Sequence, residues 1–259
     1  GFSVHPAAAQ FSELKRLAEA GDARAQNDLG VFYTYGINGA PRDLAAALKW
    51  YAKAVAQNLP SAIGNLGYVY QQGLGCPKDE QKGLALIRQA VEAGDIHAMN
   101  HLAYAHMYGL GTERDEIKAA AIYRQAATSG DAHAMAVLAD FLRNGRGCVR
   151  NDEEAIEWAR KGAGLSDAAA MFILGDMYRD GRGGVARDLT TAAGWYDSAA
   201  RLGERGAQEQ MGRILEQGDG LPKNMDSAVK WYELAAGNGC TGAIRRLAEL
   251  RFYGIGVPK

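Results

Sequence analysis

The sequence predicts an all-α protein, a solenoid built from about six to seven stacked repeats of a helix pair. Three observations predict this class: an apolar residue recurs every 36 or 37 residues, a small residue follows it directly, and a glycine stands seven residues after it. A repeat of this length holds one pair of helices, and a single pair cannot bury its apolar face. The copies are therefore expected to stack and to form a long concave surface.

The first helix of each repeat, here called helix A, is identified by its apolar stripe. An alanine stands four residues before the recurring apolar residue, so both lie on one face of a helix. The small residue that follows allows a neighbouring helix to approach closely. The apolar positions are Leu29, Leu66, Leu102, Leu138, Leu174, Met211 and Leu247, and the alanines are Ala25, Ala62, Ala98, Ala134, Ala170, Ala207 and Ala243.

Helix A is expected to end at the glycine, which readily adopts the left-handed conformation that closes many helices. A short loop then leads to a residue whose side chain can cap the second helix, here called helix B. The predicted caps are Asp43, Asp79, Asp115, Asn151, Asp188 and Asn224. In helix B an alanine or glycine is followed three residues later by Trp, Leu or Ile. We interpret the four tryptophans at Trp50, Trp158, Trp195 and Trp231 as core residues.

The repeats define the expected domain organisation. Residues 10–259 are predicted to form a single repeat domain, preceded by a disordered segment at residues 1–9. Full repeats are predicted over residues 22–58, 59–94, 95–130, 131–166, 167–203 and 204–239. Incomplete units are predicted at residues 10–21 and 240–259, and the first of these is typical of a helix B without its helix A.

Composition argues against several classes of partner. Lys and Arg number 29 and Asp and Glu number 30, which gives a formal net charge of -1. Nucleic acids and anionic lipids attract basic surfaces, so neither is expected as the main partner. No apolar stretch approaches the roughly 20 residues that span a bilayer, so no membrane insertion is expected.

We expect a soluble monomer in the unbound state. The compartment is undetermined: cytoplasmic, or periplasmic or secreted if an upstream signal peptide was removed.

A longer motif recurs along the chain: Ala-x-x-x-Leu-Gly-x-x-Tyr-x-x-Gly-x-Gly, then Asp, Ala, Trp-Tyr and Ala-Ala-x-x-Gly. It resembles the Sel1-like repeat, a relative of the tetratricopeptide repeat. The clearest copies span residues 62–75 and 188–203, and the resemblance covers about residues 11–259. It implies a right-handed superhelix of antiparallel helix pairs that serves as an adaptor or scaffold in protein complexes. Members of this family are common in bacterial signalling and secretion and also occur in eukaryotic protein quality control.

Variable positions on helix A are the candidate partner-binding site, since helix A lines the concave side in the related tetratricopeptide arrays. The first three repeats offer tyrosine and asparagine there, whereas repeats four to six offer charged residues. Aromatic residues and arginine supply most of the strong contacts in protein interfaces. The alternative interpretation is a solvated helix face with aromatic packing between repeats. The predicted partner-binding residues are Asn27, Tyr35, Tyr68, Asn100, Tyr104, Tyr108, Asp140, Arg143, Asp176, Arg179, Asp180 and Arg213.

No catalytic residue, metal site or cofactor is predicted. His97 and His101 are four residues apart, a spacing at which two imidazoles can share a metal. No third ligand accompanies them, however, and His133 repeats the position of His97. The Gly-x-Gly pairs follow helices and lack the lysine of a phosphate loop. The three cysteines include no C-x-x-C pair, so neither a cysteine zinc site nor a disulfide framework is expected.

The sequence leaves two functions open. The first is a scaffold or adaptor that holds a partner protein or peptide on the concave surface lined by helix A. The alternative is an inhibitor or immunity-type protein that neutralises a folded bacterial toxin or effector enzyme, a role that the resemblance implies for some family members. A groove binder would retain affinity for a short peptide, whereas an inhibitor would need its whole folded target. An enzyme or a carbohydrate-binding module is disfavoured because no acid/base constellation is visible.

Overall fold

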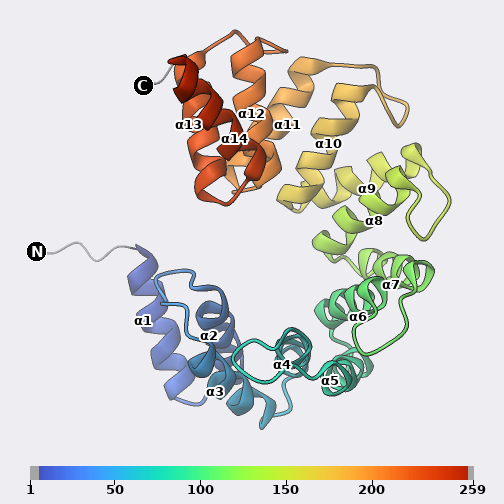
Figure 1. The fold of residues 1–259 in the computed structure, drawn as a ribbon. Helices are drawn as coiled ribbons and strands as arrows, with labels where there is room; N and C mark the ends of the chain where they lie inside the picture. The colour runs from blue at the N-terminus through green and yellow to red at the C-terminus, as the bar shows by residue number, and fades with distance from the viewer. Residues whose placement is uncertain (1–5, 256–259) are drawn as a thin grey trace, which may run out of the picture. The chain divides into compact units, whose positions relative to one another are not determined.

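The computed structural model describes residues 6–255. Within that range every regular element is an α-helix, and fourteen helices follow one another without a strand (Figure 1). The predicted all-α solenoid of helix-pair repeats is therefore confirmed. Residues 1–5 of the segment expected to be disordered, and residues 256–259 of the last incomplete unit, lie outside the described residues.

The helices alternate between the two predicted types. Helix A corresponds to α2 (Ala23–Tyr35), α4 (Pro60–Gln72), α6 (Ile96–Tyr108), α8 (Ala132–Asn144), α10 (Ala168–Asp180), α12 (Arg205–Gln217) and α14 (Thr241–Tyr253). Helix B corresponds to α1 (Pro6–Glu19), α3 (Leu44–Val55), α5 (Glu80–Glu92), α7 (Glu116–Thr128), α9 (Asp152–Gly164), α11 (Leu189–Arg201) and α13 (Met225–Gly237). Each full repeat thus contains one helix of each type.

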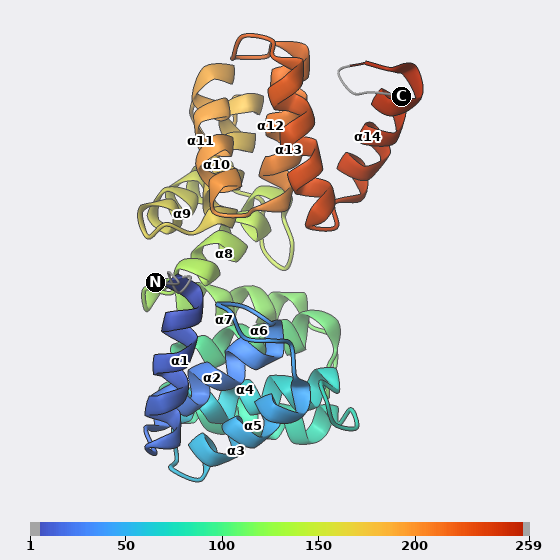
Figure 2. The ribbon, with the colours of Figure 1, turned by 90° about the vertical axis from the view of Figure 1, so that its left-hand side faces the viewer.

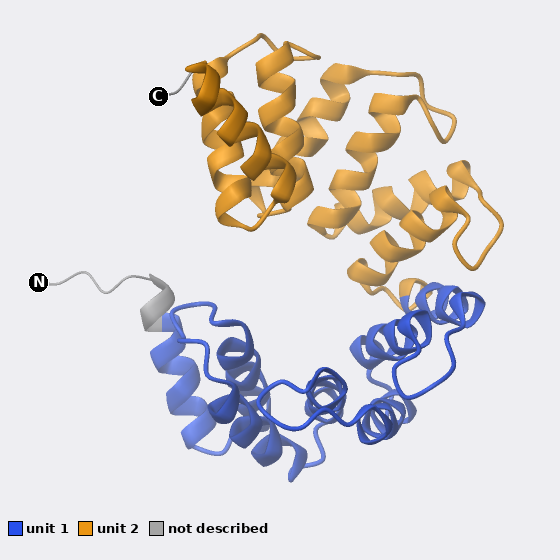
Figure 3. Ribbon diagram, viewed as in Figure 1, with its two compact units in different colours: residues 1–126 blue, residues 127–259 orange. Residues whose placement is uncertain are grey.

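The helices group into two compact units, residues 1–126 (unit 1) and residues 127–259 (unit 2), which Figure 3 colours separately. Within unit 1, α4 contacts both α5 and α6, and within unit 2, α8 contacts both α9 and α10. In unit 1, α2, α4 and α6 lie on the inner side of the arc while α3 and α5 lie on its outer side (Figure 1). Figure 2 shows the same stack of unit 1 from the side. The inner surface of unit 1 is therefore formed by helix A.

Helix α1 begins at Pro6, before the predicted start of the first incomplete unit at residue 10. Proline is favoured in the first turn of a helix, where its missing N–H would have no partner, and the alanines that follow are strong helix formers. The helix packs against α2 through Phe11, Leu14 and Ala18. It therefore occupies the place of a helix B, as its sequence pattern predicts.

Both predicted kinds of helix cap are present. The glycine that ends each helix A has left-handed dihedral angles, with φ of 65° at Gly36 and 66° at Gly254. The N–H of Ala46 donates to the Asp43 carboxylate at 3.0 Å, which caps α3. Side chains at the five other predicted cap positions accept the equivalent bond, namely Asp79, Asp115, Asn151, Asp188 and Asn224. These caps satisfy amides that would otherwise lack partners in the first turn.

The recurring alanines and the residues that follow the tryptophans in the sequence form the core. All seven helix A alanines are at most 5% exposed. Three tyrosines that directly follow a tryptophan are also buried, namely Tyr51, Tyr196 and Tyr232. The tryptophans themselves are only partly buried, and lysine ammonium groups lie over the rings of Trp50 and Trp158 at 3.9 and 4.2 Å. The tryptophans therefore flank the core, and the tyrosines fill it.

The small residue of helix A makes room for these tyrosine rings. A Cβ atom at Gly175 would lie 2.5 Å from the ring of Tyr196, well inside the roughly 3.5–4.0 Å at which carbon atoms pack. In the fourth repeat, where helix B has no tyrosine, alanine stands at both positions, Ala139 and Ala159. The close pairs of this kind are Gly30 with Tyr51, Gly175 with Tyr196, and Gly212 with Tyr232. In these three repeats glycine on helix A thus leaves room for the ring on helix B, whereas the third repeat combines Ala103 with a buried Tyr123.

Replacing Gly175 by alanine is expected to lower the free energy of unfolding by about 1–3 kcal/mol, the usual effect of overpacking a core. Gly194→Ala is the matched control. Gly194 lies inside α11, and a Cβ there would meet nothing within 4 Å. Alanine is the better helix former, so this variant should gain about 0.5–1 kcal/mol. Urea denaturation of both variants measures the difference, and equal effects would contradict the close-approach explanation.

One core position of helix A carries an ionisable side chain. His106 on α6 stands where five of the other repeats have tyrosine or leucine, and it is 3% exposed. Its Nδ1 is buried and has no hydrogen-bond partner among the described residues. Burial, aided by the nearby charges of Lys118 and Arg88, lowers the pKa of His106. The folded protein therefore favours the neutral imidazole.

This burial predicts a pH dependence of stability. In the unfolded chain His106 gains a proton as the pH falls through about 6.5, whereas in the folded protein it resists protonation. Stability should therefore be full above pH 6.5 and decline below it, by at most about 1.4 kcal/mol per pH unit from this residue. Urea denaturation at pH 7, 6 and 5 checks this. His106→Tyr, which installs the side chain of neighbouring repeats, should flatten the decline; an unchanged slope would refute the assignment.

Candidate functional site

Four candidate residues of unit 1 form an aromatic row on α2, α4 and α6, here called the tyrosine row: Tyr35, Tyr68, Tyr104 and Tyr108. The rings of Tyr104 and Tyr108 have centroids 4.5 Å apart, and the ring of Tyr68 meets that of Tyr104 edge-on at 6.5 Å. The hydroxyls of Tyr35 and Tyr68 lie close enough to influence each other's pKa. Tyr35 and Tyr108 are each 55% exposed. The row is thus continuous across three repeats, with exposed rings at its ends.

The tyrosine row is electrically neutral. Burial raises the pKa of the Tyr35, Tyr68 and Tyr104 hydroxyls, so they stay protonated at neutral pH. The imidazole of His101 stacks on the ring of Tyr68, with centroids 4.8 Å apart and planes inclined by 23°. This stacking extends the aromatic surface sideways on α6. The row therefore offers apolar faces together with hydroxyls that can donate or accept hydrogen bonds.

The two asparagines predicted beside this row are less accessible. Asn27 on α2 is 8% exposed, and its Oδ1 accepts a hydrogen bond from Nδ2 of Asn65 on α4 at 2.9 Å. Its own Nδ2 donates to Oδ1 of Asp28 at 3.2 Å. Asn100 on α6 is half-buried. The amide of Asn27 is therefore engaged between two repeats.

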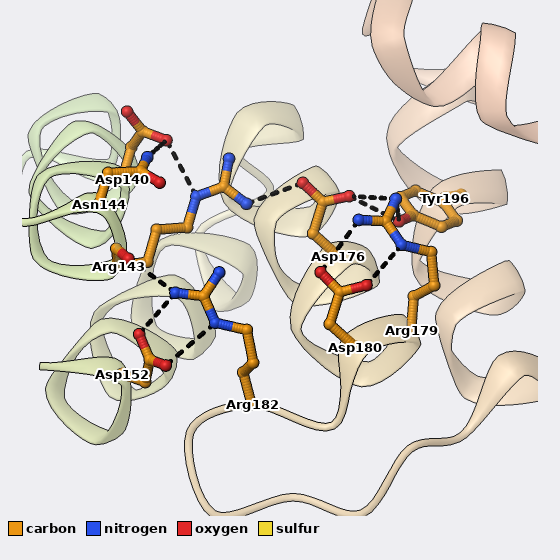
Figure 4. Close-up of polar contacts among 9 residues, drawn as sticks. All are labelled: Asp140, Arg143, Asn144, Asp152, Asp176, Arg179, Asp180, Arg182 and Tyr196. Atoms are coloured by element: carbon orange, nitrogen blue, oxygen red, sulfur yellow. Dashed lines mark hydrogen bonds and ion pairs between the residues drawn. The ribbon is translucent and has the colours of Figure 1, made fainter.

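Five charged candidates of unit 2 form one connected network (Figure 4). Arg143 on α8 donates from Nε to Asp140 at 2.9 Å and from Nη1 to Asp176 on α10 at 2.7 Å. Asp176 also accepts from the hydroxyl of Tyr196 at 2.7 Å and pairs with Arg179 at 2.9 Å. Arg179 in turn binds both carboxylate oxygens of Asp180, at 2.8 and 3.1 Å. The network thus joins two helices A to a core tyrosine of helix B.

A second arginine ties the same two repeats together from the loop after α10. Arg182 binds both carboxylate oxygens of Asp152 at the start of α9, at 3.0 and 2.7 Å, and donates to the Arg143 carbonyl at 2.7 Å. Hydrogen bonds from Arg182 and then from Arg150 hold the pKa of Asp152 well below its usual range. Such paired geometry is the strong form of an arginine–carboxylate contact. The sequence pattern assigned Arg182 only to a loop.

The remaining charged candidate, Arg213, stands apart from the network. It lies exposed on α12 and forms no hydrogen bond or ion pair with any residue in the range 6–255. Asp176, by contrast, is 8% exposed and fully engaged. The structure therefore brings the unit 1 tyrosines together in one row and five unit 2 residues together in one network. It leaves Arg213 outside that network.

Residues 6–255 contain neither a metal-binding group nor a membrane-crossing helix. No cluster of three or more His, Cys, Asp or Glu side chains there could hold a metal ion. No helix there is both long enough and apolar enough to cross a bilayer.

The repeat pattern and its helix pairs agree with one family of proteins. The Sel1 repeat model matches residues 23–59, 60–95, 96–131, 132–167, 168–204, 206–240 and 241–259. The chain belongs to the Sel1 repeat family. Sel1 repeats mediate protein–protein interactions, and scaffolds of this family are generally non-enzymatic. The resemblance inferred from the motif is therefore confirmed.

Three similar proteins illustrate the range of relatives. A Sel1 repeat protein from Oxalobacter formigenes is 28% identical, with a TM-score of 0.70 over 90% of this chain and 97% of that one. The immunity protein PA5088 from Pseudomonas aeruginosa shares the fold at 22% identity, with a TM-score of 0.56 over 96% and 84%. The ERAD-associated E3 ubiquitin-protein ligase component HRD3A of Arabidopsis thaliana is 38% identical over 65 residues, 25% of this chain. The match spans a tenth of that relative's length.

Glutamines that link Sel1 repeats escaped the sequence analysis. Gln26 and Gln208 are almost fully buried, and each donates from Nε2 to a backbone carbonyl of the preceding helix B at 3.1 Å. Gln71 is fully buried and donates to the Leu110 carbonyl of the next repeat at 3.3 Å. The available signal was a glutamine directly after the recurring alanine in two repeats. It was too infrequent to be recognised as structural.

The charged network should stabilise the Sel1 fold through Asp176. Asp176→Asn keeps the shape of the side chain but leaves two arginines without their shared carboxylate. We expect a loss of about 3 kcal/mol in the free energy of unfolding, as for other broken buried ion pairs. Asp180→Asn is the control, because the Asp180 side chain is 39% exposed and its loss should cost less than about 1 kcal/mol. Thermal and urea denaturation test this; equal losses would contradict a structural role specific to Asp176.

Proposed function

We propose that this Sel1 repeat protein is a non-catalytic scaffold that binds a segment of a partner protein on the inner helix A surface, with the tyrosine row of unit 1 as the main contact. The observation that supports this is an uncharged aromatic strip across three consecutive repeats. Tyr35 and Tyr108 remain more than half exposed, whereas Tyr51 and Tyr196 are buried in the core. Exposed aromatic groups of this kind commonly mark interaction sites.

The chemistry of the row favours an extended segment with apolar side chains. Tyrosine supplies a large, rigid contact area at low conformational cost, and its hydroxyl can bond a peptide backbone. A neutral row has no means of selecting a charged partner by itself. The solvated-face interpretation predicts no loss of binding when these rings are removed, so one experiment separates the two interpretations.

Selection of peptides from a displayed random library tests the proposal directly, because it requires no identified partner. Peptides enriched by the wild type should bind the triple variant Tyr68→Ala/Tyr104→Ala/Tyr108→Ala at least about thirtyfold more weakly, since interface anchors typically contribute about 2 kcal/mol or more. Binding is measured by fluorescence polarisation, and circular dichroism checks that the variant folds. Undiminished affinity would refute the tyrosine row as the contact.

A matched control removes three exposed apolar side chains away from the row. Ile117, Val149 and Leu165 are 74%, 88% and 56% exposed. The variant Ile117→Ala/Val149→Ala/Leu165→Ala should bind the selected peptides as the wild type does. If this control lost affinity equally, the effect would be one of general surface hydrophobicity.

The inhibitory function rests on a weaker argument. The likeness to an immunity protein is one of fold, at 22% identity, and no residue of the described surface favours a folded target over a peptide. The same peptide selection separates the two functions, because an inhibitor would enrich no short peptide above background.

We further propose that the unbound protein is a monomer and that nucleic acid is not a partner, in keeping with the net charge of -1.

A further inference from the structure

Unit 2 contains a cavity of about 230 Å³ between α10, α11 and α12. Its lining includes Arg179, Arg187, Gln210 and Arg213, together with the buried Tyr196. A second cavity of about 330 Å³ adjoins it and shares Gln210, Arg213 and Gln217. The side chains of Gln210 and Arg213 therefore stand between two hollows on the same helix A.

Two arginines in the cavity lining have no ion-pair partner among the described residues. Arg179, Arg187 and Arg213 line it together with one carboxylate, Asp219, and Arg179 is already paired with Asp176 and Asp180. The adjoining cavity is balanced: Arg213, Arg245 and Arg246 face Glu209, Glu216 and Glu249. Elsewhere in unit 2, Arg143 is matched by Asp140 and Asp176. Arg187 and Arg213 are therefore the arginines of the smaller cavity whose charge is unpaired.

Three side chains in its wall keep hydrogen-bonding groups that the fold does not use. Arg213 makes no hydrogen bond or ion pair with the residues of the described range, and Arg187 uses only its Nε, which donates to the Arg179 carbonyl at 3.1 Å. The amide oxygen of Gln210 is buried and accepts no hydrogen bond from the described residues. A buried acceptor without a donor is costly unless a ligand or water supplies one. The wall thus presents unpaired cationic donors next to an unpaired acceptor.

We propose that this cavity binds a carboxylate of the partner, held by Arg213 and Arg187, while Gln210 accepts an N–H from the same peptide. Guanidinium groups bind carboxylates through paired, charge-assisted hydrogen bonds, and the two guanidinium groups without an ion-pair partner favour an anion. The carboxylate belongs to an Asp or Glu side chain or to a chain terminus. This inference rests on the proposed protein-binding function and adds an acidic anchor to it.

Arginine Nε–H signals in two-dimensional NMR spectra of the full chain report on the cavity directly. Acetyl-glutamate N-methylamide represents a side-chain carboxylate, N-acetylglycine a terminal one, and acetyl-glutamine N-methylamide the neutral equivalent. At least one acid should shift the Arg213 and Arg187 signals at millimolar concentration, and the neutral compound should not. The acid that binds more tightly identifies the source of the carboxylate. The affinity should fall as salt is raised.

Arg213→Gln should weaken binding of the acid at least about tenfold, the loss expected for a charge-assisted hydrogen bond of about 1.4 kcal/mol or more. Arg205→Gln is the matched control, since Arg205 is an exposed arginine on the same helix, outside the cavity, and its loss changes the net charge equally. Equal shifts with the neutral compound, or equal weakening by the two variants, would overturn the proposal. The NMR titration does not involve the tyrosine row of unit 1. A negative titration would therefore leave the peptide-selection result unchanged, and a negative peptide selection would leave the titration result unchanged.

Discussion

Close approach of helix A and helix B within a repeat is the constraint on which the rest of the structure depends. A glycine such as Gly175 lets the ring of Tyr196 lie against the helix A backbone, where a single Cβ would be 2.5 Å away. That approach brings the tyrosine hydroxyl to the residue after the glycine, where it donates to Asp176 at 2.7 Å. Tyr232 reaches Glu216 at 2.9 Å in the same way. One missing side chain thus connects core packing with the charged inner surface.

The two units use the same helix A positions differently. In unit 1 the variable positions carry uncharged rings, which pack along the row and leave Tyr35 and Tyr108 exposed. In unit 2 most of the variable charges are engaged with one another, since buried ionic groups must be paired to be tolerated. Cohesion and recognition therefore compete for the same residues. Those that satisfy each other, such as Arg143 and Asp176, stabilise the stack, and those left over, such as Arg213, are available to a partner.

This separation between residues that hold the repeats together and residues left unpaired agrees with a binding role better than with a catalytic one. The repeated residues are committed to caps and core, and the family's repeats mediate protein–protein interactions. The two proposed contact sites differ in chemistry, since the tyrosine row is aromatic and neutral and the unit 2 cavity is lined by arginines. Aromatic contacts supply affinity, while charge complementarity contributes mainly to specificity and rate of association.

The sequence by itself determined the period, the helix types, the helix caps and the recurring alanines of the core, because helix bonds and caps join residues only a few positions apart. It also predicted which helix faces vary. Only the tertiary structure decided that Asn27 is engaged by Asn65 and that Arg182 reaches Asp152. It also decided that the core is filled by the tyrosines that follow three of the tryptophans. The bonds of Asn27 and Arg182 join side chains 38 and 30 residues apart. Their formation depends on how one helix pair rotates against the next, and no local pattern in the chain encodes that rotation.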